Sequence, residues 1–211
     1  MYMTRVFLKR LPTPNIIHGI LSEAFPGKRS ESANESLWRT DDLENSKVLI
    51  IVSACFPDIQ QIVGKIGVNK FCSAYNTNIE KNDKTIDYSP FLKQIENNQS
   101  WNFRLRANPV EHKKQSPTDQ RGKIFALRTV AEQIHWLEKQ GSKYGFTIRG
   151  CSVVGDSWIV FGKVRIHAIT YDGLLTVTDA DAFRSALSQG IGRGKAYGCG
   201  LLTVARYNYE E

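Results

Sequence analysis

A glycine-rich run near the end of the chain combines a flexible backbone with positive charge. The stretch QGIGRGKAYGCGLLTVA spans residues 189–205, and residues 190–200 within it hold five glycines together with Arg193 and Lys195. Glycine lets the main chain bend tightly and leaves its N–H groups accessible, so such a run can hold an anion. The alternative is a helix C-cap at Gly190 followed by a turn into a strand.

The elements expected around this run exclude two common phosphate-binding motifs. A helix is predicted at 179–189, N-capped by Thr178 or Asp179, and a strand at 201–207. Dinucleotide-binding and P-loop motifs need the opposite order, with a strand before the glycines and a helix after them. We therefore expect no nucleotide cofactor, and instead a backbone loop that can pack along a phosphodiester chain.

Positive charge is concentrated in two parts of this 211-residue chain, whose formal net charge is +7. Residues 101–128 hold seven Lys and Arg against two acidic residues, and residues 143–206 hold eight against four. This concentration favours a polyanionic partner, with a solvated basic surface as an equal alternative.

Several other classes of protein are disfavoured by the sequence. No run approaches the roughly 18 consecutive apolar residues of a membrane span, and the start MYMTRVFLKR does not resemble a signal peptide, so we expect a cytoplasmic protein. The four cysteines form no CxxC pair and are interpreted as small buried residues. Because there is no HxxxH motif and no dense cluster of acidic and histidine residues, no metal is expected.

Hydrophobic periodicity predicts an α+β fold of two tandem ferredoxin-like (RRM-like) βαββαβ domains, although one mixed sheet is also compatible with it. We expect a first domain at 1–112, a linker or mobile loop at 113–123 and a second domain at 124–211. In the first half, strands are predicted at 2–8, 36–40, 47–54 and 101–109, and helices at 15–25, 59–65 and 90–97. In the second half, helices are predicted at 128–140 and 179–189, strands at 146–154, 157–161, 164–171 and 201–207, and a tight turn at Asp172-Gly173 into LLTVT.

Five stretches of this sequence together resemble the CasE family, the type I-E CRISPR-associated endoribonucleases that cut precursor CRISPR RNA at repeat hairpins. They are HGILSEAFPG, FRLRANP, AEQIHWL, GLLTV and the glycine-rich run itself. The similarity runs from the first expected strand to the last, and only about residues 55–99 match poorly. The resemblance implies two tandem ferredoxin-like domains, binding of a CRISPR repeat hairpin and a role in antiviral defence. It also implies metal-independent cleavage that leaves a 2′,3′-cyclic phosphate or a 3′-phosphate, with the product retained in the Cascade complex.

The resemblance places the catalytic histidine at His18, on the first expected helix. From the residues alone, His18 lies at the edge of the apolar stripe of that helix, where a structural role is the more common one. Family members commonly have a tyrosine three residues earlier, and this chain has Asn15 there. An asparagine can hydrogen-bond a phosphate but cannot shuttle a proton, so a non-catalytic RNA-hairpin-binding subunit of the same fold is the alternative function.

Candidate RNA-binding residues follow from charge and position. Arg104 and Arg106 share one face of a strand, where their guanidinium groups could follow successive phosphates or simply be exposed. In the family a basic hairpin and helix grip the RNA stem, and the hairpin expected from residue 163 to 177 has one polar, cationic face. The complete set of candidates is Lys28, Arg29, Arg104, Arg106, Lys163, Arg165, Arg193 and Lys195.

Overall fold

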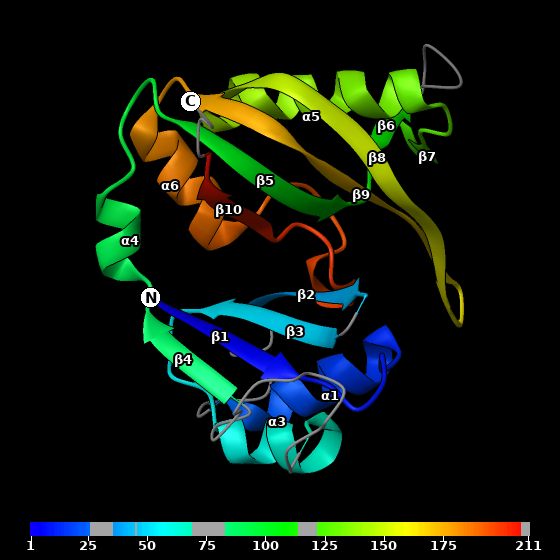
Figure 1. Cartoon of the computed structure of the whole chain (residues 1–211). Helices are drawn as coiled ribbons and strands as arrows, with labels where there is room; N and C mark the ends of the chain where they lie inside the picture. Colours follow the sequence, from blue (N-terminus) through cyan, green and yellow to red (C-terminus); the bar gives the residue numbers. More distant parts are fainter. Residues whose placement is uncertain (26–35, 45, 69–82, 114–121, 208–211) are drawn as a thin grey trace. The chain divides into compact units, whose positions relative to one another are not determined.

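A computed structural model describes residues 1–25, 36–44, 46–68, 83–113 and 122–207 of the chain. The chain forms two compact units. The first is Met1–Gln94 with Lys195–Leu201, and the second is Ile95–Gly194 with Leu202–Glu211. Each unit contains one four-stranded antiparallel sheet with helices packed against it (Figure 1). None of the helices in these described ranges is long and apolar enough to cross a membrane.

The first unit has the strand order of a ferredoxin-like sheet, β2-β3-β1-β4. Helices α1 and α3 cover one face, where Val6, Ile17, Trp38 and Ile51 belong to one buried apolar cluster. The strand predicted at 47–54 is β3, which is central in the sheet because it pairs with both β2 and β1. The elements are β1 (Tyr2–Phe7), α1 (Pro14–Ala24), β2 (Ser36–Leu43), β3 (Ser46–Ser53), α3 (Ile59–Ile66), β4 (Asp83–Asp87) and α4 (Ser89–Lys93), with the short 3₁₀ helix η2 (Lys195–Tyr197).

The second unit repeats the same order in its sheet, β10-β5-β9-β8, with α5 and α6 as its helices. Helix α5 begins with a capping box between Thr129 and Glu132 and ends at Gly145, which adopts the left-handed conformation. The Thr129 hydrogen bonds also lower the pKa of the Glu132 carboxyl group. The elements are β5 (Ser100–Ala107), β6 (Val110–Lys113), β7 (Lys123–Ala126), α5 (Val130–Tyr144), β8 (Phe146–Phe161), β9 (Val164–Val177), α6 (Ala180–Gln189) and β10 (Leu202–Arg206).

The two repeats confirm the tandem ferredoxin-like prediction and correct its details. The strand expected at 101–109 does not complete the first sheet, because β5 pairs with β9 and β10 and so opens the second. The fourth strand of the first sheet is β4, which the sequence analysis did not predict. The first compact unit runs to Gln94, and a domain boundary at 112 stays a prediction from the sequence. Most of the expected linker at 113–123 lies outside the described residues, and its described ends belong to the β6–β7 hairpin.

Three local predictions are wrong, at least in part. The three strands expected between 146 and 171 are two long strands, β8 and β9, joined at Gly162 and Lys163. Asp172 and Gly173 are not a turn but continue β9, where Asp172 lies opposite Arg104 of β5. The cysteines are also not all buried, because Cys55 is exposed and Cys151 only half-buried, while Cys199 is buried as expected.

The position of Gly173 inside the sheet gives a direct stability test. A Cβ atom at Gly173 would lie 2.2 Å from the Gly150 carbonyl oxygen and 2.8 Å from Cys151 Cα, whereas a Cβ at Gly150 would meet nothing within 4 Å. We expect Gly173→Ala to lower the free energy of unfolding by about 1–3 kcal/mol through overpacking. Gly150→Ala is the matched control and should change it by less than about 1 kcal/mol. Equal denaturation midpoints for the two variants would contradict the position of Gly173 in β9.

Candidate nucleic-acid interface

Helix α1 places His18 where its imidazole can reach solvent. The helix begins after the N-cap residue Thr13, with Pro14 in its first turn, and buries Ile17, Ile20, Leu21 and Ala24 against the sheet. His18 lies beside this stripe and is half-buried, while Asn15, one turn earlier, is exposed. Because residues three apart are neighbours on a helix surface, the amide and the imidazole lie on the same flank. The predicted position of His18 at the edge of the apolar stripe is confirmed.

The glycine-rich run lies between a helix and a strand, as its sequence predicts. Helix α6 ends at the cap residue Gly190, and Gly192, Gly194, Gly198 and Gly200 all have positive φ angles. This backbone carries the chain from the second unit into the first at Lys195 and back again after Leu201. The helix cap at Gly190 is therefore confirmed, and anion binding by the rest of the run stays a prediction.

Residues 195–201 dock on the first unit beside the helix that carries His18. Helix η2 contacts both α1 and β2. A Cβ at Gly198 would lie 2.6 Å from the Trp38 ring, and the φ of Gly198 is 80°, so a glycine is needed at this close approach. The structure thus brings together the elements of two predicted site residues, His18 on α1 and the half-buried Lys195 on η2.

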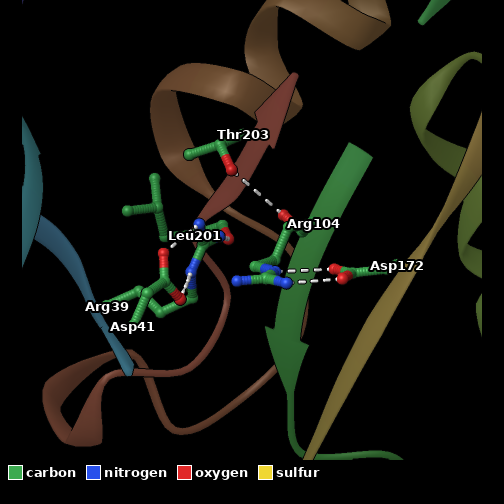
Figure 2. Close-up of polar contacts among 6 residues, drawn as sticks. All are labelled: Arg39, Asp41, Arg104, Asp172, Leu201 and Thr203. Carbon is green, nitrogen blue, oxygen red and sulfur yellow. Dashed lines mark hydrogen bonds and ion pairs between the residues drawn. The ribbon is translucent and has the colours of Figure 1, made fainter. Parts of the chain in front are cut away.

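A buried ion pair anchors this docked segment. The Arg39 guanidinium donates to both carboxylate oxygens of Asp41, at 2.8 and 2.9 Å, and its third nitrogen donates to the Leu201 carbonyl oxygen at 3.0 Å (Figure 2). Arg39 is only 2% exposed. A guanidinium can be buried when its donors are satisfied in this bidentate geometry. The end of the glycine-rich run is therefore held to strand β2 by a charged group.

The arginines of strand β5 are engaged within the second unit. Arg104 donates to both carboxylate oxygens of Asp172, at 2.6 and 2.5 Å, and Thr203 donates to the Arg104 carbonyl oxygen (Figure 2). Arg106 donates to the Ser157 hydroxyl at 3.2 Å. The bidentate pair offsets the charge of Arg104, whereas the Arg106 contact is with a neutral hydroxyl, and phosphate binding by either arginine stays a prediction.

The remaining predicted cations lie at exposed positions or outside the described residues. Lys163 lies at the turn of the β8–β9 hairpin and Arg165 follows on β9, and both are exposed. Arg193 is also exposed, and its backbone bridges to Asn108. Lys28 and Arg29 fall within 26–35, outside the described residues. The hairpin and Arg193 belong to the second unit, whereas His18 and Lys195 belong to the first.

Sequence reasoning missed a cluster of side chains on the β8–β9 hairpin. Trp158 of β8 lies directly opposite His167 of β9, and their rings stack with centroids 4.5 Å apart. The Nε2 atom of His167 lies 2.7 Å from Asp156 Oδ1. The only signal in the sequence is the alternation of polar and apolar residues in DSWIV and RIHAI. That alternation assigns each side chain to a face of its strand, but the cross-strand partner depends on the register.

The fold and these surfaces define the chain as a tandem ferredoxin-like protein with a half-exposed histidine in one unit and a cationic hairpin in the other. Residues 1–206 match the family model described as CRISPR associated protein, and the chain belongs to this family.

The proteins similar to this chain include two curated relatives and a solved RNA complex. The CRISPR-associated endoribonuclease Cse3 of Thermus thermophilus is 28% identical over 220 residues, which cover 96% of this chain and 94% of the relative. The Cascade subunit CasE of Escherichia coli is 37% identical over 115 residues, which cover 49% and 56%. The structure of Thermus thermophilus Cse3 bound to an RNA representing a pre-cleavage complex has a TM-score of 0.75 at 26% identity, covering 97% of this chain and 98% of that chain. These similarities place the chain in the CasE/Cse3 branch of the family.

The buried anchor of the glycine-rich run can be tested by stability measurements. Replacing Arg39 by Met removes two charged donors from the buried Asp41 carboxylate, so we expect the free energy of unfolding to fall by about 3–5 kcal/mol. The exposed pair Lys47–Asp42, at 3.2 Å, provides the control, and Lys47→Ala should cost less than about 1 kcal/mol. Chemical denaturation measures both variants. A loss for Arg39→Met no larger than that for Lys47→Ala would show that the anchor is not structural.

Proposed function

We propose that this chain is an endoribonuclease that binds CRISPR repeat hairpins and cleaves precursor CRISPR RNA. The observation that carries the proposal is the half-exposed His18 on α1, next to the cationic segment that begins at Lys195. Membership of the family supports it, together with a relative over nearly the whole chain that is named an endoribonuclease and has been seen with a pre-cleavage RNA.

The proposed reaction uses the 2′-hydroxyl of the RNA as its nucleophile. This hydroxyl lies next to the phosphorus and needs only in-line alignment. The 2′-oxygen forms a bond to phosphorus, the bond from phosphorus to the 5′-oxygen breaks, and the departing oxygen takes up a proton. The product end is a 2′,3′-cyclic phosphate, which water can open to a 3′-phosphate. This step requires no bound metal.

His18 would transfer a proton in this step, either as base on the 2′-hydroxyl or as acid on the 5′-oxygen. Lys195, and Lys28 or Arg29 if they lie near the phosphate, would stabilise the charge that develops on it. Asn15 would hydrogen-bond the RNA, because a carboxamide both donates and accepts hydrogen bonds but does not titrate. His18 therefore has to act without a titrating partner at position 15.

The RNA stem would be gripped through its phosphates. Lys163 and Arg165 on the β8–β9 hairpin and Arg193 before η2 are exposed cations suited to this contact. Arg104 and Arg106 could contribute only by exchanging their internal partners, Asp172 and Ser157, for phosphate. A-form stems are recognised mostly by shape and backbone, so contacts of this kind are sufficient.

We further propose that the chain retains its product and works within a Cascade complex in the cytoplasm. The similarity to a protein named as a Cascade subunit supports this assembly. A non-catalytic RNA-hairpin-binding subunit of the same fold is the second candidate function. The observation that favours it is the asparagine at position 15, which removes a titratable group from the proposed site.

Replacement of His18 separates the two candidate functions. We expect His18→Ala to slow single-turnover cleavage of a repeat hairpin by about 100- to 10,000-fold, because a positioned acid or base contributes that much. Hairpin affinity should stay within about twofold, since one side chain adds little to binding that is shared among many phosphate contacts. The control is His135→Ala, which removes an exposed histidine of α5. This variant should cleave the hairpin at the wild-type rate. Near-normal cleavage by His18→Ala would remove His18 from the mechanism.

The identity of the nucleophile is tested on the substrate rather than on the protein. One 2′-deoxy substitution immediately upstream of the scissile phosphate removes the attacking oxygen, so cleavage should stop while binding is unchanged. Unmodified RNA should be cut at the same rate in excess EDTA. Product formation on gels measures both reactions. Cleavage of the deoxy substrate, or arrest of the normal reaction by EDTA, would contradict attack by the 2′-hydroxyl.

A further inference from the structure

The β8–β9 hairpin of the second unit carries a hollow that the proposed cleavage reaction does not use. Its volume is about 520 Å³, within the usual range for a small-ligand site. It is lined by Arg128, Asp156, Trp158, Arg165 and His167. All five residues belong to the second unit, so the hollow is complete without His18 or η2.

The centre of the hollow is an aromatic surface whose support is fixed. Trp158 stacks on His167 at an interplanar angle of 10°, so one face of the indole is covered. The His167 side chain is only 5% exposed, and its two nitrogens lie 2.7 Å from Asp156 Oδ1 and 3.2 Å from the Leu127 carbonyl oxygen. Trp158 nevertheless remains 49% exposed. A large flat ring therefore faces solvent on a support that cannot easily rotate.

Two guanidinium groups border this ring. Arg128 and Arg165 are exposed, and among the described residues neither guanidinium makes an ion pair. The Asp156 carboxylate is 55% exposed and offers an acceptor for an N–H group. The flat apolar face of the indole matches a nucleotide base, and the two cations match its phosphate. The carboxylate can accept a hydrogen bond from an N–H group of the base.

We propose that this hollow binds one unpaired nucleotide of the RNA, with its base stacked on Trp158 and its phosphate held by Arg128 and Arg165. The nucleotide must be unpaired, because bases within a duplex already stack on one another and their faces are not available. The inference rests on the proposed function in taking the ligand to be RNA. It adds a contact to a single-stranded flank or loop next to the proposed grip on the stem, and Arg165 would serve both contacts.

Tryptophan fluorescence can report on this site, because Trp158 is the tryptophan that an RNA base can contact directly. The other three tryptophans are buried, because Trp38, Trp101 and Trp136 are 2, 5 and 8% exposed. We expect single-stranded hexa-adenylate RNA to quench the fluorescence of the full chain. A blunt-ended RNA duplex should bind without quenching, since it offers no free base. Equal quenching by the duplex, or no quenching by the hexanucleotide, would overturn the proposal.

Variants of the lining residues give a second readout, the fluorescence anisotropy of labelled hexa-adenylate. Trp158→Ala should weaken binding by about 5- to 100-fold through loss of stacking. Arg128→Ala combined with Arg165→Ala, both at exposed positions, should lower the slope of log affinity against log salt by about 1.4. The control is Val160→Ala, an exposed apolar residue two positions from Trp158 on the same strand, which should bind normally.

Several outcomes separate this proposal from the proposed function. Equal affinities of Trp158→Ala and Val160→Ala, or an unchanged salt slope in the double arginine variant, would refute the nucleotide site even if the chain cuts repeat RNA. Conversely, the expected quenching and variant effects in a chain that does not cut repeat RNA would support the nucleotide site and refute the nuclease function.

Discussion

The hydrogen-bonded ion pair of Arg39 and Asp41 is the constraint on which the candidate catalytic region depends. It binds the Leu201 carbonyl oxygen and so fixes the end of the segment that enters the first unit at Lys195. A buried pair of this kind contributes little net stability, because desolvation offsets most of the attraction. Its effect is positional: residues 195–201 are held against β2 and α1, and the helix of His18 acquires a cationic neighbour.

The general plan of the protein could be predicted from local patterns. Helix α1, the central strand β3 and the helix and strand that flank the glycine-rich run all follow from periodicity, prolines and capping residues, which act over a few positions in the chain. The same patterns placed His18 at the edge of an apolar stripe, and its half-buried state confirms that reading. The alternation of strands and helices was also sufficient to favour two ferredoxin-like repeats.

What could not be predicted depends on pairing between distant strands. The alternation of residues in β5 would be the same if the strand closed the first sheet or opened the second. Its pairing with β9 and β10 shows that it belongs to the second sheet. The same pairing places Asp172 opposite Arg104, so this candidate phosphate ligand has an internal partner in the free chain. The stacking of Trp158 on His167 likewise depends on the register of β8 and β9. A charge pattern in the sequence therefore cannot show that Arg104 already has an internal acidic partner.

The central claim is that this chain cuts repeat RNA by proton transfer at a site on the first unit, with the RNA supplying its own nucleophile. The most direct measurement incubates the purified wild-type chain with end-labelled repeat RNA from its own genome and determines the chemical nature of the new ends. The account predicts one cut at the hairpin, leaving a 2′,3′-cyclic phosphate or 3′-phosphate on one product and a 5′-hydroxyl on the other. Tight binding without any cut, or products with a 3′-hydroxyl and a 5′-phosphate, would contradict it.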